Sequence, residues 1–348
     1  MLLRSGADGV SGAADLYHFG PGLTVSIRGE RRARAYFRAE YASAALTTET
    51  DVPAVEATIG ARVRGHTDVT THQPELLGTH KLARWRASVP MRPDVSTMRV
   101  AVAVRGPLGL ALVQSHVIEP LVSLAAIRAG SVLLPGAAIV REGKTLLLIG
   151  RSRSGKTSLA ARALATGRRV LGDDQVLINA DRECLPFPRR LRLYPDLART
   201  APAAFAALPP SVRGRLAALG RVNALTRGFV APPVSVSASA LGAGAAAPIR
   251  LLVGEVVVIR RAQVTALTFE RLDHEELAAE ADDVLVGQRS ELFSVPGVQA
   301  AYETLLDHER AIISCALADA PARRVLVPTS WTSEQAVGAL ARALELDS

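Results

Sequence analysis

Eight residues near the middle of the chain combine glycine, lysine and hydroxyl side chains at the spacing that phosphate binding requires. Residues 150–157 read Gly-Arg-Ser-Arg-Ser-Gly-Lys-Thr, which fits the pattern G-x-x-x-x-G-K-[ST]. Gly150 and Gly155 are expected to adopt positive φ and to let backbone amides approach an anion. Lys156 would then reach the β- and γ-phosphates of a nucleotide, and the Thr157 hydroxyl would bind Mg²⁺.

The whole loop and the start of the following helix are predicted to bind this nucleotide, because amides at a helix N-terminus attract phosphate. Arg151 and Arg153 could add charge for a triphosphate, or they could merely face solvent. The competing interpretation is an inert turn that matches the pattern by chance. The predicted nucleotide-binding residues are Gly150, Arg151, Ser152, Arg153, Ser154, Gly155, Lys156, Thr157 and Ser158.

Two adjacent carboxylates follow the loop. Asp173 comes seventeen residues after Lys156, which leaves room for one helix and one short returning strand that would bring Asp173 and Asp174 near the loop. In phosphoryl transfer, one carboxylate helps to hold Mg²⁺ and another accepts the proton of the attacking hydroxyl. We predict Asp173, Asp174 and Lys156 as catalytic residues, and Thr157 and Asp174 as metal ligands. The residues alone do not decide which carboxylate is the base, and a polar turn between strands is the competing interpretation.

Apolar runs and helix signals predict the elements that position these residues. A strand at residues 145–149 leads into the loop, and a helix at 156–166 follows it and ends at Gly167. Strands and helices mix through the rest of the chain, which favours an α/β fold. The other expected elements are strands at 23–27, 99–104, 169–171, 176–178, 250–259 and 324–327, helices at 119–129, 273–286 and 297–318, and a last helix opened by Thr332-x-x-Gln335.

Two domains are expected from the length of 348 residues. Residues 1–110 are predicted to form a small α+β domain of unknown role, and residues 111–348 a nucleotide-binding catalytic domain. Residues 201–247 are rich in Ala, Pro, Ser and Gly, and they are expected to form a loop that is either a lid or a linker-like insertion. The spacing of His66, His72 and His80 fits no compact ligand pair, so we interpret them as surface histidines rather than a metal site.

Composition limits the expected partners. The formal charge is +8, and the 41 basic residues include only three lysines, which leaves 38 arginines spread along the chain. With 4% aromatic residues there are few platforms for stacking bases, so nucleic acid is not expected as a partner. Arg189, Arg190 and Arg192 form one local cluster that could hold an acidic substrate or phosphate, or could form a solvated face.

Cysteine content and hydropathy predict the compartment. Cys184 and Cys315 are too few for a disulfide framework and are expected to be free thiols in a reducing environment. The N-terminal residues lack an apolar core of signal-peptide length, and no uncharged apolar run reaches about 18 residues. A cytoplasmic protein without membrane contact is therefore expected.

Residues 147–174, with the sequence LLIGRSRSGKTSLAARALATGRRVLGDD, resemble the catalytic core of the HPr kinase/phosphorylase family. That family's pattern is an apolar strand, a GxSGxGK[ST] loop, a helix, a short strand and Asp-Asp. The flanking PFPRRLRL stretch is more similar to HPr-kinase-related enzymes of peptide natural-product pathways, such as kinases of lasso-peptide precursors. The resemblance implies a P-loop-containing HPr-kinase/phosphoenolpyruvate-carboxykinase-like core, ATP with Mg²⁺, a serine hydroxyl of a peptide or protein as acceptor, and a possible homo-oligomer.

The chain departs from this family at two points. The family usually has a histidine in the strand before the loop strand, at a position that corresponds to about Leu134 here. This sequence has no histidine between His116 and His274. The family's later signature for HPr recognition and phosphorolysis is not visible in residues 175–260. Both departures argue against HPr as the substrate and against the reverse phosphorylase activity.

The predicted function is therefore an ATP-dependent kinase that transfers the γ-phosphate to a hydroxyl, with serine of a peptide or protein as the expected acceptor. Two alternatives share the same residues. One is a nucleotide-binding regulatory protein without transfer activity, and the other is a kinase of a small molecule such as an amino acid or a sugar.

Overall fold

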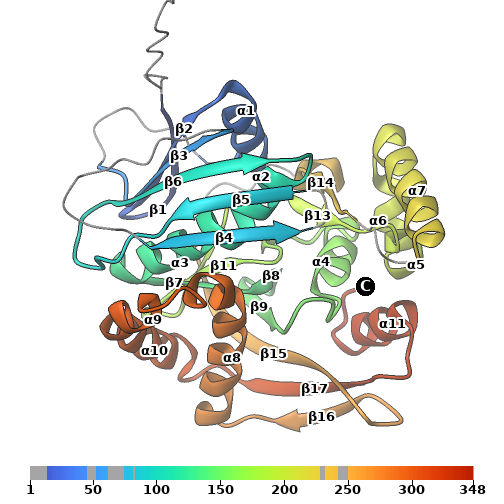
Figure 1. Ribbon diagram of the computed structural model, residues 1–348. Helices are drawn as coiled ribbons and strands as arrows, with labels where there is room; N and C mark the ends of the chain where they lie inside the picture. Colours follow the sequence, from blue (N-terminus) through green and yellow to red (C-terminus); the bar gives the residue numbers. More distant parts are fainter. Residues whose placement is uncertain are drawn as a thin grey trace, which may run out of the picture. The chain divides into compact units, whose positions relative to one another are not determined.

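The computed structural model describes residues 14–44, 52–61, 74–80, 83–227, 232–241 and 250–347 (Figure 1). The chain divides into two compact units. Unit 1 comprises Met1–Ala129 and Arg289–Leu305, and unit 2 comprises Gly130–Gln288 and Leu306–Ser348. Both units mix helices with strands, so the expected α/β class is confirmed at this level. Of the three histidines considered above, His66 and His72 lie outside the described residues.

Unit 1 contains a mixed sheet that, within the described ranges, has the strand order β1-β2-β3-β6-β5-β4. The pairs β2–β3 and β3–β6 are parallel, and the other pairs are antiparallel. Alternating apolar residues of β1 and β3 are buried, as expected for strands with one face toward a core. The strands are β1 (Asp15–Gly20), β2 (Leu23–Gly29), β3 (Val55–Gly60), β4 (Glu75–His80), β5 (Ala83–Ser88) and β6 (Met98–Arg105).

Helices of unit 1 pack on this sheet. Helix α1 (Arg31–Glu40) contacts β2, and a continuous helical segment over residues 109–128 contacts β2, β3, β5 and β6. That segment consists of α2 (Gly109–Val113), a π-helical turn (Gln114–Ile118) and α3 (Glu119–Arg128). Its length and apolar composition would suffice to cross a membrane, but 78% of its most apolar 18-residue window is buried inside the structure.

The predicted boundary between residues 110 and 111 differs from the division in the structure. The α3 helix is almost entirely buried and belongs to unit 1. A second segment returns to unit 1 from far along the chain, where Arg289 Nη2 donates a hydrogen bond to Ser123 Oγ at 2.8 Å. Tyr302, which follows α9 (Val298–Ala301), donates from its hydroxyl to the Pro90 carbonyl at 2.9 Å. The local patterns used for the prediction carry no signal for such long-range packing.

Unit 2 is built around a larger mixed sheet. Within the described ranges its main order is β10-β8-β9-β15-β12-β11-β7, and β17 pairs with β15 and with β16. The longest strand, β15, runs parallel to both β9 and β17. The strands are β7 (Ser131–Leu134), β8 (Gly136–Arg141), β9 (Lys144–Ile149), β10 (Val170–Gly172), β11 (Val176–Asn179), β12 (Glu183–Pro186), β15 (Leu251–Ala262), β16 (Thr268–Arg271) and β17 (Ala322–Pro328).

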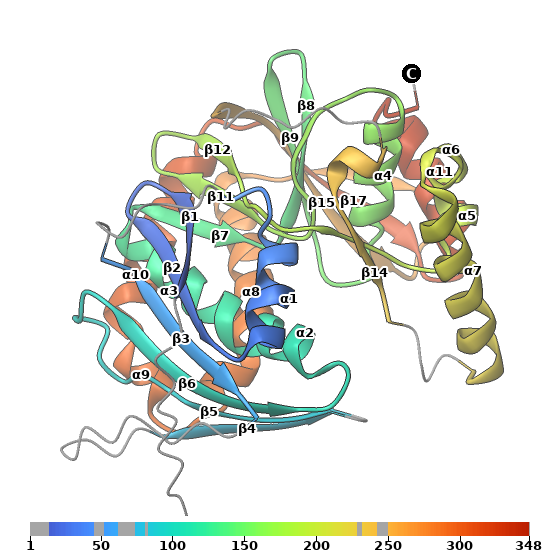
Figure 2. The ribbon, with the colours of Figure 1, turned by 90° about the horizontal axis from the view of Figure 1, so that it is seen from above.

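Helices cover both faces of β9 and β15 in unit 2. Figure 2 shows α4 (Lys156–Ala165) and α11 (Ser333–Ala343) on one side, with α8 (His274–Phe293) and α10 (Glu303–Leu317) on the other. Leu146 and Leu148 of β9 belong to the core under α4 and α11, whereas Leu147 and Ile149 belong to the core under α8 and α10. A strand that is buried on both faces reads as a continuous apolar run, which explains the TLLLI sequence.

A third core lies beside α4 and corrects one expectation. Residues 201–225, which were expected to be part of a loop, are mostly helical in α6 (Pro202–Ala207) and α7 (Pro210–Leu225). Leu216 of α7 and Ala204 of α6 pack in a cluster with Leu164 of α4. The alanines favour helix, and Pro202 and Pro210 stand at first helical positions, where a proline needs no partner for its nitrogen. The short strands β13 (Leu191–Leu193) and β14 (Val234–Val236) pair beside this cluster.

The remaining expected elements are present with shifted ends. Capping by Thr332 is confirmed, because its hydroxyl accepts from the Gln335 amide and the Gln335 side chain accepts from the Thr332 amide. The expected helix 297–318 is interrupted at Tyr302 and forms α9 and α10. A tight turn precedes β9, where Glu142 and Gly143 both have positive φ (51° and 74°).

Candidate phosphate-binding site

The loop at residues 150–155 connects β9 to α4 in unit 2. Strand β9 holds its start in place, since Leu148 and Ile149 pair in parallel with Val257 and Val258 of β15. Helix α4 begins at Lys156, directly after Gly155 as its N-cap. The free amides of its first turn therefore lie in the same segment as Lys156 and Thr157, as the sequence predicted.

The two glycines of the loop serve different purposes. Gly155 has φ of 99°, in the left-handed region, as expected. The prediction of positive φ was wrong for Gly150, which is absent from the left-handed region. A Cβ at Gly150 would instead lie 2.7 Å from the Ile259 carbonyl oxygen and 3.0 Å from Ser154 Oγ. Gly150 is needed because the backbone passes close to β15, and Gly155 because of its dihedral angle.

Lys156 is folded into the loop. Its side chain is buried, and its ammonium donates hydrogen bonds to the Gly150 carbonyl at 2.5 Å, the Arg151 carbonyl at 3.1 Å and Ser154 Oγ at 3.3 Å. Burial lowers the pKa of Lys156 from its usual value, and the charges of Asp174 and Asp173 oppose this shift. Both carboxylates therefore lie close enough to Lys156 to act on its charge, as the sequence predicted.

Asp173 is a buried carboxylate whose charge is only weakly compensated. It follows β10, which returns from α4 to pair with β8. Its exposed fraction is 6%, and among the described residues neither of its oxygens has a hydrogen-bond partner of ordinary geometry. Burial and the neighbouring Asp174 charge raise its pKa to about 7, against weaker lowering by the Thr157 hydroxyl, Arg189 and Lys156. Asp173 thus lies next to Thr157, the predicted metal ligand.

Asp174 is held differently. Its φ is 74°, its side chain is 47% exposed, and Oδ2 lies 3.1 Å from Arg189 Nη1. Loss of solvent around the Asp174 carboxyl raises its pKa. The charges of Arg189, Arg192 and Lys156 outweigh this effect, so the net shift of the pKa is downward. Asp174 therefore stays ionised at neutral pH, whereas the neighbouring Asp173 carboxyl titrates near neutral pH.

The arginine cluster after β12 is only partly solvated. The Arg189 side chain is 3% exposed, so the interpretation as a solvated face is wrong for this residue. Arg190 donates a hydrogen bond to the Ser235 carbonyl. The charge of Arg192 on β13 lowers the pKa of Asp174. Burial and the charge of Asp174 raise the pKa of Tyr194, and the charge of Arg192 lowers it. The cluster thus places positive charge around the exposed side of Asp174, a pairing that sequence spacing could not have revealed.

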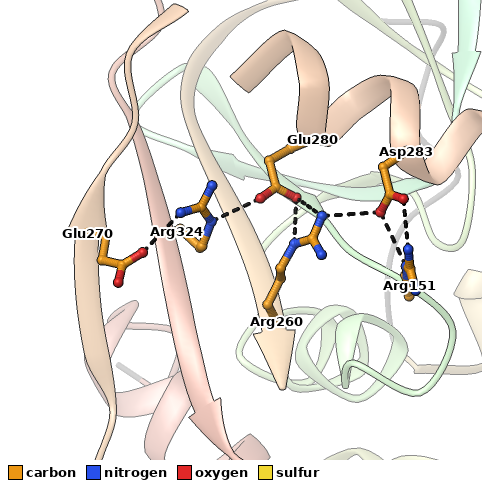
Figure 3. Close-up of polar contacts among 6 residues, drawn as sticks. All are labelled: Arg151, Arg260, Glu270, Glu280, Asp283 and Arg324. Carbon is orange, nitrogen blue, oxygen red and sulfur yellow. Dashed lines mark hydrogen bonds and ion pairs between the residues drawn. The ribbon is translucent and has the colours of Figure 1, made fainter. Parts of the chain in front are cut away.

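Arg151 lies at one end of a row of alternating charges (Figure 3). Its Nη2 and Nε lie 2.7 and 3.2 Å from the two oxygens of Asp283 on α8. Arg260 of β15 contacts both Asp283 and Glu280, and Arg324 of β17 joins Glu280 to Glu270. Asp283 is 132 residues from Arg151 in sequence and belongs to no motif, so sequence analysis could not have found this pair.

The other predicted loop residues have separate environments. Ser154 is buried, whereas Ser152 and Arg153 are exposed. Ser158 Oγ donates to Thr200 Oγ1 at 3.1 Å, so its hydroxyl bonds to α5 (Leu197–Thr200) rather than to the loop. Thr157 is partly buried at the start of α4. The structure thus brings Lys156, Thr157, Asp173 and Asp174 together.

The residues fit a nucleotide with its metal ion. Gly150 and Gly155 disfavour a side chain, through a close contact and a left-handed φ respectively. The buried carboxylate of Asp173 beside the loop has no hydrogen-bond partner of ordinary geometry among the described residues. No group of three or more His, Cys, Asp or Glu side chains in the described ranges could hold a metal alone. This is compatible with Mg²⁺, which is usually bound through one or two protein ligands together with phosphates and water.

Comparisons with known proteins find no family model that matches this chain and no curated protein that matches its sequence. The similarity to HPr kinases therefore remains a prediction from the motif in residues 147–174.

Proposed function

We propose that this protein is an ATP-dependent kinase that transfers the γ-phosphate to a hydroxyl group, with serine of a peptide or protein as acceptor. The observation that carries the proposal is the position of Asp173 beside Thr157 and Lys156 at the phosphate loop. Asp173 is a buried carboxylate, and among the described residues its oxygens have no hydrogen-bond partner of ordinary geometry. A simple nucleotide-binding loop has no need of such a group, whereas phosphoryl transfer to a hydroxyl needs a proton acceptor.

Each residue has a distinct proposed role. The amides of the loop and of the first turn of α4 bind the phosphates, and Lys156 turns from the loop carbonyls toward the β- and γ-phosphate oxygens. Thr157 and Asp174 are the residues that would hold Mg²⁺, which when bound supplies positive charge against the phosphates. Arg189 keeps Asp174 ionised and in place through their ion pair.

Asp173 is the proposed base in the transfer step. The acceptor hydroxyl loses its proton to the Asp173 carboxylate while its oxygen bonds to the γ-phosphorus. The bond between this phosphorus and the oxygen that bridges to the β-phosphate breaks, and ADP leaves with the electron pair. The phosphorylated acceptor is the second product.

The test is transfer of label from [γ-³²P]ATP to peptides and proteins encoded beside this gene. We expect labelled serine with the wild type, and loss of labelling with Asp173→Asn while the variant still binds a fluorescent ATP analogue. Nucleotide binding without transfer to any acceptor would instead support a nucleotide-binding regulatory protein. Labelling of a free amino acid or sugar alone would show a small-molecule kinase.

A further inference from the structure

The two arginines of the loop differ in how their charges are compensated. Arg151 makes two hydrogen bonds to Asp283, which is also bound by Arg260 (Figure 3). Arg153 is exposed and has no ion pair or hydrogen bond with any residue in the described ranges. Moving Arg151 to a phosphate would break its pair with Asp283, whereas an incoming anion would gain the charge of Arg153 without breaking any contact.

The backbone at Arg153 has an unusual conformation for an arginine. The Ser154 amide donates to the Arg151 carbonyl at 3.3 Å, which closes a turn over residues 151–154. Arg153 is the third residue of this turn and has φ of 67°, whereas Ser152 is not among the residues with positive φ. A type II turn has these signs of φ, and its third position favours glycine because a side chain is strained there.

Glycine at this position would relieve the strain. The arginine side chain makes no compensating contact in the described part of the chain. Strained residues persist mainly where a site requires their side chain or their conformation. Arg182 and Arg227 are also left-handed, so the conformation by itself does not mark a site. What distinguishes Arg153 is its place within the phosphate loop, where its exposed charge has no partner in the described ranges.

We propose that Arg153 binds the terminal phosphate of the donor nucleotide, so that the site favours a nucleoside triphosphate over a diphosphate, while Arg151 remains on Asp283 and holds the loop. This inference rests on the proposed function, because it concerns the same nucleotide. A guanidinium group can donate two parallel hydrogen bonds to two phosphate oxygens, which suits the γ-phosphate with its exposed oxygens. The β-phosphate is already served by the loop amides and Lys156.

The experiment compares the affinities of AMP-PNP, a non-hydrolysable triphosphate, and of ADP by titration calorimetry with Mg²⁺. Arg153→Gly is expected to weaken AMP-PNP about 10- to 100-fold, as for loss of a charged hydrogen-bonded pair, and to change ADP by less than about twofold. Its melting temperature should rise, because glycine relieves the turn. Arg153→Lys keeps the charge but loses the planar fork, so its AMP-PNP affinity should lie between those of Arg153→Gly and the wild type.

Arg227→Gly is the matched control. Arg227 is also exposed and left-handed, with φ of 49°, and it follows α7 away from the loop. The control should raise the melting temperature and leave both nucleotide affinities unchanged. Asp283→Asn tests the role of Arg151, and it should weaken AMP-PNP and ADP by the same factor because the loop is held less firmly.

Three outcomes would overturn the inference. Equal weakening of AMP-PNP and ADP by Arg153→Gly would show that the residue acts through loop conformation. Unchanged affinities for both would show an arginine that only faces solvent or serves the acceptor. Both outcomes leave the proposed kinase in place, whereas a wild-type protein that binds neither nucleotide would overturn the kinase and this inference together.

Discussion

Two aspartates with similarly small exposed fractions have opposite environments in the two units. Asp15 of unit 1 is 7% exposed and Asp173 of unit 2 is 6% exposed. Asp15 accepts four hydrogen bonds from Arg34 and Arg38, at 2.6 to 3.2 Å. Asp173 accepts none of ordinary geometry from the described residues.

Their pKa values move in opposite directions for this reason. Burial raises the pKa of Asp15, but the hydrogen bonds and charges of Arg34 and Arg38 outweigh it and the net shift is downward. Burial raises the pKa of Asp173 to about 7, with the Asp174 charge adding to the effect. Burial alone therefore does not determine the state of a carboxylate. A compensated one stabilises the fold, and an uncompensated one indicates a site that binds or reacts.

The largest expected effect is on phosphoryl transfer. Asp173→Asn should lower the transfer rate about 10²- to 10⁴-fold, because the amide cannot accept the proton. Rates from single-turnover labelling with [γ-³²P]ATP at saturating nucleotide measure this directly. Asp15→Asn is the matched control, since it makes the same chemical change at a position with a similar exposed fraction outside the site. Its folded fraction should transfer phosphate at the wild-type rate. Equal losses in both variants would mean that Asp173 serves the fold rather than the reaction.

The second effect is on stability, where we expect Asp15→Asn to lose more unfolding free energy than Asp173→Asn. Asp15→Asn should lose about 2 kcal/mol of unfolding free energy, because two arginines lose a charged acceptor. Asp173→Asn should lose no unfolding free energy at pH 8, since it removes a buried charge that is only weakly compensated. Urea unfolding of metal-free protein in EDTA measures both. A large loss for Asp173→Asn would show that the carboxylate is compensated in solution.

The third effect is the pH dependence of these differences. Asp15 has a folded pKa below its unfolded value of about 3.9, so its contribution is complete above pH 4 and is lost as the pH falls through the folded pKa. Asp173 has a raised folded pKa of about 7, so the folded state binds more protons between about pH 4 and 7 and its contribution falls as the pH rises through that window. Relative to Asp173→Asn, the wild type should therefore be more stable at pH 5 than at pH 8. Melting temperatures from pH 3 to 8 would test both slopes, and parallel curves for wild type and variant would contradict the assignment.

The sequence predicted the loop, the helix after it and the acidic pair because each depends on local chemistry. Glycine at a left-handed position, a hydroxyl at a helix start and an apolar run buried on both faces leave signals within a few residues. The Thr332 capping box is recognisable for the same reason.

What the sequence could not predict depends on residues that meet across the fold. Arg151 pairs with Asp283, and Asp174 pairs with Arg189. Each pair forms only when the folded sheet brings the two residues together. The need for glycine at position 150 was attributed to a positive φ. The constraint is instead the close approach of the backbone to the Ile259 carbonyl of another strand. The two compact units differ from the predicted domain boundary for the same kind of reason, since the segment around Tyr302 joins unit 1 through tertiary contacts.

The smallest expected effect separates the two partners of Asp15. Arg34 and Arg38 stand one helical turn apart on α1, and each makes two hydrogen bonds to the same carboxylate. The Arg34 side chain is 22% exposed, whereas that of Arg38 is 57% exposed and therefore screened by water and salt. Arg34→Gln should cost about 1 kcal/mol, and Arg38→Gln should cost less.

Urea unfolding at low salt and in 0.5 M NaCl can separate these contributions. Added salt should reduce the cost of Arg38→Gln more than that of Arg34→Gln, because only the exposed pair is strongly screened. Equal costs that respond equally to salt would mean that Asp15 is compensated by both arginines as one unit. Its contrast with Asp173 would then rest on the number of partners rather than on the burial of one of them.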